Sequence, residues 1–406
     1  MPKSRAALLP LALALAIVAP RALLAADFRV DDLELLSHGT YNSPSGAFDV
    51  GSLLYFDLSL EGGDKFSGLL RMDFLNGDVE NALNLSTTTL DNSATNADLA
   101  TRLNNLLSPN LETVAITAKS VFDSPVDVSY FVGQMDKFCT GDDFVSLFGA
   151  APFATDLRGP MVYPDGVGNN PNLWYDGIYQ AEGTGFRFGT TPKLSGSSIA
   201  YAYLYQDSNL GTGHWSADLR YLFNSPAVKT ELFAGMSTGG PYGYYRGGLL
   251  FYATSGDVGE FYTQAGLSYY DPSQPLSLDN IYFLFEPRIN FGIGQAAITV
   301  FYHPAWYLQQ YYGASGEKDA IDAAFNLRFG HVSQSGAEGG LQTLLEFRPL
   351  TTDTSVTAPL TVDASPYYAL ITGGVRWDFK LQLRLFPFPD PWYGMFMPFI
   401  GVKTSY

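Results

Sequence analysis

Hydrophobic and polar side chains alternate one by one over several short stretches of the chain. The clearest stretch is 375–385, where apolar residues at the odd positions alternate with Arg376, Asp378, Lys380, Gln382 and Arg384. Successive side chains of a β-strand point to opposite faces of a sheet, so one face of this stretch is apolar and the other is polar. A tilted strand needs about 9–11 residues to cross a bilayer. The pattern therefore predicts membrane-spanning strands here and, by the same alternation, at 48–61, 214–223, 228–237 and 321–330.

Short and long connections alternate between the predicted strands. Short turn signals rich in Gly, Pro, Asn, Asp and Ser lie at 61–65, 123–125, 191–193, 224–226, 255–258, 292–294 and 333–337. Longer links lie at 77–110, 138–176, 207–213, 239–243, 271–279, 304–318 and 349–361. Outer-membrane barrels have short periplasmic turns and longer extracellular loops. The alternation thus places the short links on one side of a membrane and the long ones on the other.

The predicted strands number about 18, with 16 as a close alternative. The count depends on 362–386, which a turn at Gly373 and Gly374 divides into two strands. An even count keeps both ends of the chain on the same side of the membrane. The first candidate strand, 28–41, alternates less regularly than the others. The expected fold is all-β, a transmembrane antiparallel up-and-down β-barrel.

The N-terminal 26 residues have the pattern of a cleaved signal peptide. Lys3 and Arg5 form a basic start, an apolar run follows at 6–19, and Ala25 and Ala26 offer a cleavage site. The apolar run is too short to span a membrane. We expect 1–26 to be removed during export and 27–406 to form a single barrel domain.

The composition agrees with a barrel that faces lipid. Aromatic residues make up 15% of the chain and charged residues 16%, and the mean hydropathy is +0.02. No window of about 18 apolar residues predicts a transmembrane helix. Three of the 23 Lys and Arg residues, and none of the 40 Asp and Glu residues, lie in 1–26, so the exported part is strongly acidic. An acidic chain argues against nucleic acid as a partner.

The end of the chain carries a more specific signal. The segment 392–406 places Phe396, Ile400, Val402 and Tyr406 on one face and ends on an aromatic residue. It resembles the C-terminal signature of bacterial outer-membrane β-barrels. The resemblance implies the outer membrane of a diderm bacterium, contact with its lipid, and recognition of the last strand, which ends at Tyr406, by the barrel-assembly machinery.

The longest link, 138–176, follows the fifth predicted strand and is rich in aromatic and acidic residues. Thr140 or Gly141 can begin a short helix with Asp142 and Asp143 in its first turn, and Gly149 can end it. Loops of this length in a compact fold are often functional. In this layout the chain resembles general porins of sixteen strands, in which the long third loop folds into the lumen and narrows it. A homotrimer is compatible with that resemblance.

The porin resemblance supplies the candidate pore residues. In those porins, carboxylates on the loop face arginines on the barrel wall. The constriction candidates on the loop are Asp142, Asp143, Asp156 and Asp165. The basic candidates for the pore wall are Arg71, Arg220, Arg246, Arg288, Arg328, Arg348, Arg376, Lys380 and Arg384. A transverse field between these two groups would favour polar solutes, because rings of charge set the selectivity of pores.

Two functions stay open. The first is an outer-membrane channel for passive diffusion of small polar solutes or ions, with 138–176 as its constriction. The second is a barrel whose lumen is plugged or ligand-specific, used for uptake of an apolar solute or for surface adhesion. The apolar pair Ala200 and Ala202, on a face expected to line the lumen, favours the second function.

Enzymatic and metal-dependent functions are not expected. The segment 235–239 matches the Gly-x-Ser-x-Gly pattern of a nucleophile elbow, but that motif needs a helix after it, and Gly240, Pro241 and Gly243 follow instead. The four histidines have no metal-binding spacing. No cofactor is implied. Cys139, the single cysteine, cannot form an internal disulfide and is expected to be a free thiol.

Overall fold

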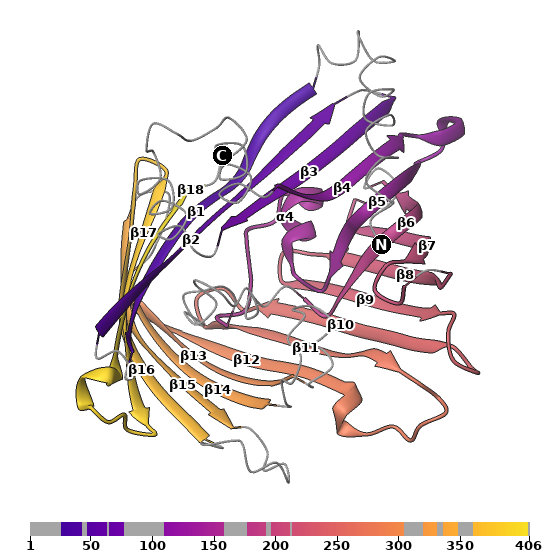
Figure 1. Ribbon diagram of the computed structural model, residues 1–406. Coiled ribbons are helices and arrows are strands. Elements are labelled where there is room, and N and C mark those ends of the chain that lie inside the picture. Colours follow the sequence, from indigo (N-terminus) through magenta and orange to yellow (C-terminus); the bar gives the residue numbers. More distant parts are fainter. Residues whose placement is uncertain are drawn as a thin grey trace, which may run out of the picture.

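The chain forms one large, curved antiparallel β-sheet (Figure 1). The computed structural model describes residues 26–42, 47–62, 65–76, 109–157, 177–191, 196–211, 213–303, 320–330, 336–347 and 360–404. Residues 1–25 of the predicted signal peptide, and the terminal Tyr406, lie outside the described residues. Within the described part, no helix has both the length and the apolar character needed to cross a membrane.

Eighteen strands of the described residues make up the sheet. The first nine are β1 (Ala26–Asn42), β2 (Ala47–Gly62), β3 (Phe66–Asn76), β4 (Pro109–Ala118), β5 (Val126–Phe138), β6 (Tyr179–Thr190), β7 (Ser198–Asp207), β8 (Trp215–Asn224) and β9 (Val228–Ser237). The others are β10 (Tyr244–Thr254), β11 (Gly259–Tyr270), β12 (Ile281–Phe291), β13 (Gly294–His303), β14 (Ala320–Gly330), β15 (Gly336–Phe347), β16 (Leu360–Thr372), β17 (Val375–Phe386) and β18 (Phe396–Thr404). In the part of the chain that the structure describes, the helical pieces are η2 (Val121–Asp123), α4 (Asp142–Phe148), η4 (Leu278–Asn280) and η5 (Trp392–Met395).

The sheet closes on itself. Each strand pairs antiparallel with the next one along the chain, and β1 also pairs with β18, from Leu33 opposite Thr404 to His38 opposite Phe399. A closed ladder has no unpaired edge, which is a requirement for β-structure in lipid. The predicted up-and-down barrel and the preferred count of 18 strands are therefore confirmed. The turn at Gly373 and Gly374, both with positive φ, separates β16 from β17 as predicted.

The connections separate into two sets at opposite ends of the barrel. Consecutive strands are antiparallel, so alternate connections lie at alternate ends. One end holds the short turns, among them 225–227, 255–258, 292–293 and 373–374, together with the start of β1 and the end of β18. The other end holds the longer links, including 139–178. The alternation of short and long links in the sequence therefore indicates at which end of the barrel each link lies.

Burial follows the predicted alternation along the strands. In β8, Trp215 and Leu219 are exposed, whereas Asp218 and Arg220 between and beside them are buried. In β17, Trp377 and Phe379 are exposed and Lys380 is buried. Other large apolar side chains that point outward and are exposed include Leu204, Leu232, Phe285, Ile298, Phe325, Leu341 and Ile400. An apolar outside with a polar inside is the arrangement of a membrane-spanning barrel.

The sequence-based prediction for one face of β7 is wrong. Ala200 and Ala202 do not line the lumen. The buried residues of β7 are Ile199, Tyr203, Tyr205 and Asp207, and Ala200 shares the opposite, outer face with the exposed Leu204. Alanine side chains are too small to reveal by themselves which face of a strand is buried. The tyrosines that alternate with them carry the inward face.

Gly183 provides a test of this packing. It lies on the inner face of β6 with φ +152°, and a Cβ atom there would lie 1.9 Å from the carbonyl oxygen of Gln206 on β7. We expect Gly183→Val to destabilise the folded barrel by about 2 kcal/mol or more through overpacking and backbone strain. The measurement is urea unfolding, followed by the difference in gel migration between heated and unheated samples.

The matched control is Gly68→Val. Gly68 lies in β3, and a Cβ atom there would meet nothing within 4 Å. This variant should unfold at the same urea concentration as the parent protein. Equal midpoints for the two variants would contradict the packing of β6 against β7.

Candidate pore constriction

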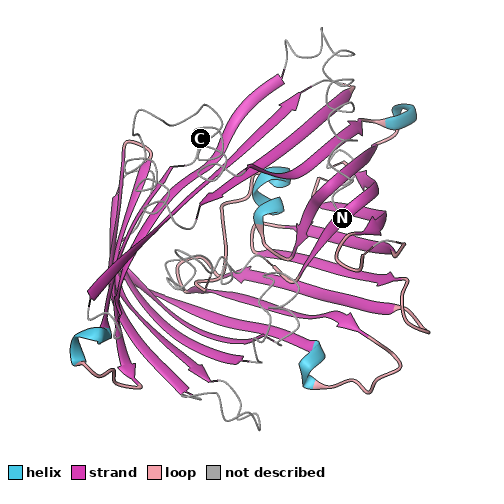
Figure 2. Cartoon of the chain, in the orientation of Figure 1, coloured by secondary structure: helices cyan, strands magenta, loops and turns pink. Residues whose placement is uncertain are grey.

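The chain leaves β5 at Phe138 and turns into the barrel. Residues 139–157, called here the inner segment, contain α4 and lie inside the ring of strands (Figure 2). Gly141, with φ +93°, begins α4, and the backbone N–H of Gly149 donates to the carbonyl oxygen of Val145 at its end. Asp142 and Asp143 occupy the first turn, as predicted. Residues 158–176 of the long link lie outside the described residues.

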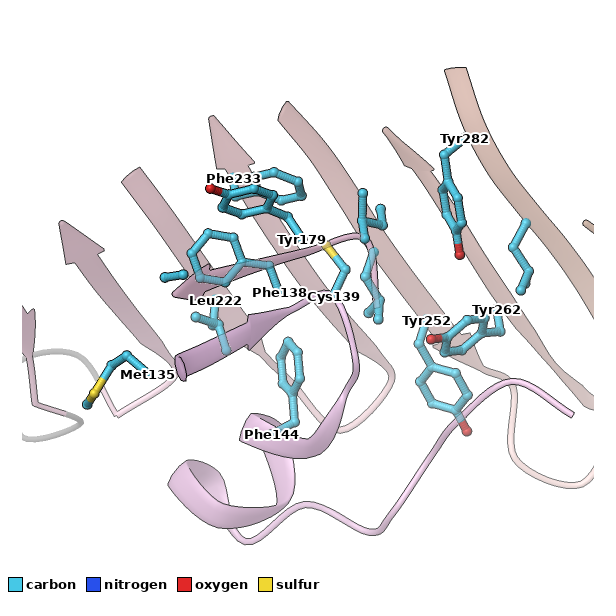
Figure 3. Packing of buried hydrophobic residues seen from close by; sticks show 14 of the residues in the cluster. Met135, Phe138, Cys139, Phe144, Tyr179, Leu222, Phe233, Tyr252, Tyr262 and Tyr282 are labelled. Carbon is cyan, nitrogen blue, oxygen red and sulfur yellow. The ribbon is translucent and has the colours of Figure 1, made fainter. Parts of the chain in front are cut away.

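Aromatic side chains attach the inner segment to the wall. Phe144 of α4 points toward the strands, beside Leu222 and Phe138 (Figure 3). The Phe153 ring stacks on Tyr252 of β10 with 4.6 Å between centroids and also contacts Phe144. Phe144 and Leu157 have no exposed surface. Burying each such side chain stabilises the folded state by about 1.5–3 kcal/mol, so the described part of the link has its own apolar core against the wall.

A first set of charges fixes the beginning of the inner segment. Glu231 of β9 accepts the backbone N–H of Cys139 at 2.7 Å and pairs with Arg220 of β8 at 2.6 Å. Arg220 also pairs with Asp143 of α4 at 2.5 Å. Both Arg220 and Glu231 have fully buried side chains. The side chain of Gln264 on β11 donates to the carbonyl oxygen of Cys139. The backbone of the loop therefore takes the place of water around buried charges of the wall.

A second set of charges fixes its end. Glu286 of β12 accepts the Thr155 hydroxyl at 2.7 Å and the backbone N–H of Asp156 at 3.0 Å. Arg288 of the same strand donates to Glu286 and to the carbonyl oxygen of Ala154. The Asp156 carboxylate in turn accepts from Arg328 at 2.8 Å and from Asn326 at 3.0 Å, both on β14. Removing one partner from such a buried cluster typically costs about 3–5 kcal/mol.

The contacts of the inner segment follow the wall in strand order. They run from β8 and β9, through β10 and β11, to β12 and β14. β14 is nine positions from β5 in the ring of 18 strands, so the segment ends against the far side of the barrel from its start. We call β8–β14 the loop-facing wall, and β15–β18 with β1–β3 the opposite wall.

The opposite wall carries its own polar pairs. Arg376 bonds Asp378 at 2.9 Å, Lys380 donates to Gln342 at 3.0 Å, and Arg384 pairs with Asp363 at 2.5 Å. Near the short-turn end, Lys403 lies 3.7 Å from Glu34, and on β3 Arg71 lies 3.9 Å from Glu112. Most of these pairs join neighbouring strands or neighbouring inward positions of one strand, whereas Lys380 of β17 reaches across β16 to Gln342 of β15.

The sequence-predicted residues take three kinds of position. Asp143 and Asp156 contact arginines of the loop-facing wall, and Asp142 is exposed on α4. The basic candidates Arg71, Arg220, Arg246, Arg288, Arg328, Arg376, Lys380 and Arg384 lie on strands and have polar partners. Asp165 and Arg348 lie outside the described residues.

Sequence reasoning missed the two glutamates that bind the loop backbone, Glu231 and Glu286. Each occupies an inward position of a strand with regular alternation, two residues from another polar inward side chain. That placement marks a polar wall position. It does not reveal that these carboxylates accept hydrogen bonds from backbone N–H groups of the loop.

The Gly-x-Ser-x-Gly match at 235–239 has a structural role. No helix follows it; the chain turns through 238–243 into β10. Ser237 contacts Ser216 at 2.6 Å and accepts from Arg246. Gly235 is opposite both Asp218 and Arg246 in the ladder, and a Cβ atom there would lie 1.8 Å from the Asp218 carboxylate. Glycine therefore lets Arg246 reach across β9 to Asp218, at 2.6 Å. Among the described residues, no group of His, Cys, Asp and Glu could hold a metal ion.

These features define the class of protein. An antiparallel barrel closed by its first and last strands, apolar outside and polar inside, with a long link folded inward after the fifth strand, is an outer-membrane β-barrel of porin-like architecture. No family model matches the sequence, and no curated protein matches it. Among solved structures, the chain is similar to porins.

Three of these structures illustrate the likeness. A mutant of the Rh. blastica porin is 9% identical, with 94% of this chain and 100% of that chain covered and a TM-score of 0.44. OprB of Pseudomonas putida is 12% identical, with 94% of each chain covered and a TM-score of 0.43. A loop-deletion mutant of OmpT, an outer membrane protein of Vibrio cholerae, is 10% identical, with 94% and 99% covered and a TM-score of 0.38. At these scores, the fold assignment rests on the strand pairing.

The reactivity of the Cys139 thiol tests whether the beginning of the inner segment is buried. It has no exposed surface, and burial, reinforced by nearby Glu231, raises the pKa of its thiol well above the usual range. Only the thiolate reacts with maleimides, so at neutral pH the raised pKa lowers the reactive fraction. We expect folded protein to react about a hundredfold more slowly than urea-unfolded protein, measured by mass spectrometry. The control is Cys139→Ser with Ser146→Cys on the exposed side of α4, which should react rapidly when folded. Similar rates for both folded proteins would contradict the buried inner segment.

Glu286→Gln tests the second anchor. A glutamine keeps the shape of the side chain but loses one acceptor oxygen and the charge that Arg288 pairs with. We expect amide exchange over 153–157 to accelerate about ten- to a hundredfold, because a hydrogen bond to a charged group contributes about 1.5–3 kcal/mol. Hydrogen–deuterium exchange with mass spectrometry measures this.

The matched control is Glu260→Gln, since Glu260 pairs with Arg288 on the adjacent strand at 3.0 Å. It should leave exchange over 153–157 nearly unchanged. If both variants accelerated exchange equally, Glu286 would have no special role in holding the loop.

Proposed function

We propose that the protein is an outer-membrane channel for passive diffusion of small polar solutes, narrowed by the inner segment. The observation that carries this proposal is the exposure of the inward basic side chains. Behind the inner segment, Arg220, Arg246 and Arg288 are 0–6% exposed. Arg328, which pairs with Asp156 at the end of the inner segment, is 30% exposed. Away from the segment, Arg71, Arg376, Arg384 and Lys403 are 27–39% exposed. Water thus reaches inward charges beside the inner segment and along the opposite wall.

The location follows from the outside of the barrel. A closed ladder with exposed apolar side chains on its outer face is stable in lipid and unfavourable in water. We propose that 1–26 is a cleaved export signal, that the outer belt contacts outer-membrane lipid, and that the last strand, ending at Tyr406, is read by the barrel-assembly machinery. A homotrimer is the proposed assembly.

The constriction is proposed to lie between α4 and the opposite wall. Asp142 is exposed on α4, while Asp143 and Asp156 hold the segment to the loop-facing wall. In this proposal the two paired carboxylates set the width of the passage by positioning the segment, and Asp142 faces solvent. Asp165 keeps its proposed place on the same link.

A second candidate function has a specific observation in its favour. On the opposite wall, the side chains in the middle of the strands are closely covered: Lys380, Gln382, Asp363 and Phe399 are each at most 5% exposed. A tightly lined middle suits a ligand-specific or blocked lumen. Conductance separates the two functions, because a blocked barrel passes no steady ion current.

The decisive experiment records purified, folded protein in a planar bilayer. We expect stable open channels. Replacement of 142–149 by a Gly-Ser linker of equal length removes α4 and should raise single-channel conductance about twofold, because conductance grows with the open cross-section of a pore. The control replaces 273–276, in the exposed link between β11 and β12, with the same type of linker. It should conduct like the parent. Absence of any stable channel from heat-modifiable protein would refute the diffusion function.

A further inference from the structure

The outer face of the barrel is polar where the neighbouring strands β5, β6 and β7 (Figure 1) approach the end with the long links. Tyr179 and Ala181 of β6 are buried on the inner face, so the residues that alternate with them point outward. The ladder places the facing residues of β5 and β7 on the same outer side. We call this group the polar window; its members are Gln134, Lys137, Gln180, Glu182, Thr184 and Gln206.

The two charges in the polar window are exceptional in this barrel. Of the charged strand residues whose side chains the structure describes, the strand register and the ion pairs place all but Lys137 and Glu182 on the inner face. The outward direction of Lys137 depends on a β-bulge between Gln134 and Asp136, because an extra residue there reverses the alternation of β5. Lys137 then lies opposite Gln180, whose amide donates to Glu182 at 2.7 Å.

The polar window interrupts the apolar belt. The outward apolar positions run from Trp215 to Phe223 on β8 and from Val375 to Leu385 on β17. On β6 they comprise Phe186 and Phe188 alone. A tilted strand uses about 9–11 residues to cross a bilayer, and this count, started at Thr190 beside the short turn, reaches 180–182. Charged side chains on the lipid-facing side destabilise a barrel, so acyl chains are a poor cover for this part of the wall.

The composition of the window favours a protein as its cover. Anionic lipid headgroups are recognised by clusters of Lys and Arg, whereas the window carries one cation, one anion and four amide or hydroxyl side chains. Nearer the short turns, the rings of Tyr130, Phe186 and Phe188 on the same two strands are 44–46% exposed, and Tyr130 contacts Phe186 edge to face at 5.3 Å. Exposed aromatic residues beside polar ones are typical of protein interfaces.

A second copy of this chain matches the window in height and in charge. Copies related by an axis along the membrane normal present their windows at the same depth of the bilayer. A patch that faces such an axis meets the same patch of its neighbours, and a patch with both signs of charge can then pair with itself. A different protein would need its own polar outer face at this depth.

We infer that the polar window faces the symmetry axis of the proposed homo-oligomer, so that copies meet through the outer faces of β5, β6 and β7. Lys137 of each copy then lies against Glu182 of the next. The inference rests on the proposed assembly of copies, and it is independent of whether the lumen conducts.

Photo-crosslinking identifies what covers the window. The protein carries p-benzoylphenylalanine in place of Gln206, which is exposed on β7, and is irradiated in the outer membrane of intact cells. We expect a crosslinked dimer of this chain, identified by mass spectrometry. The control carries the same group in place of Leu341, which is 39% exposed on the outer face of β15, nine positions from β6. It should yield at least about tenfold less dimer. Crosslinks from position 206 to lipid alone, or to another protein alone, would overturn the inference.

Charge reversal tests the contact between Lys137 and Glu182 of different copies. Lys137→Glu makes the window doubly negative and Glu182→Lys makes it doubly positive. The two variants carry different affinity tags and are expressed together, and each is first shown to be folded by its heat-dependent gel migration. We expect mixed pairs to outnumber pairs of either variant with itself by about fivefold, because like charges repel and opposite charges attract across an interface. Two differently tagged parent copies serve as the control and should mix at random. Random mixing of the two variants contradicts the proposed contact.

The outcomes separate the inference from the proposals on which it builds. If copies crosslink through position 341 and not through position 206, the assembly stands and the assigned face is wrong. If the purified protein is a monomer and neither position yields a dimer, the proposed assembly fails and the inference fails with it. Conductance in a planar bilayer tests the channel function separately.

Discussion

Two buried glutamates, Glu231 and Glu286, hold the two ends of the inner segment against the barrel wall. Each is a fully buried carboxylate inside the barrel, and each accepts a backbone N–H of the inner segment in addition to an arginine. A buried carboxylate with unused acceptor capacity is costly. Water could fill that role in an open lumen. Here the loop backbone donates to one oxygen of Glu231 and to both oxygens of Glu286, so the inner segment lowers the cost of burying these carboxylates.

The barrel outside supplies the frame that makes this arrangement stable. Ladder closure between β1 and β18 leaves no edge, and the exposed apolar side chains favour lipid. Lipid gives no driving force for collapse of the lumen. The lumen must therefore be filled by side chains of the protein or by water. One half is filled by Phe144, Phe153 and their tyrosine neighbours on the wall, and the other carries paired charges. The asymmetry of the lumen thus arises from a single link.

The strands could be predicted from the sequence because alternation is a local property. In 214–223 and 375–385 the apolar positions are the outward ones, and the turn at Gly373 and Gly374 fixed the strand number. Small residues, such as Ala200 and Ala202, differ too little in hydrophobicity from their neighbours to show which face of a strand points inward. The acidic loop and the basic wall were also recognisable as groups. Their pairing was not, because the partner of each charge depends on the register of strands that are far apart in sequence.

Arg246 and Asp218 show how far beyond local pattern such pairing extends. Both side chains point inward, but they belong to strands separated by β9, and a side chain at the intervening ladder position would block their contact. Gly235 occupies that position, so its lack of a Cβ atom decides that Arg246 is neutralised by Asp218. In a sequence, the same glycine looks like part of a nucleophile motif or a weak point in a strand. The electrostatics of the lumen are thus set partly by residues that carry no charge, which is why charge patterns along the chain predict the wall but not its field.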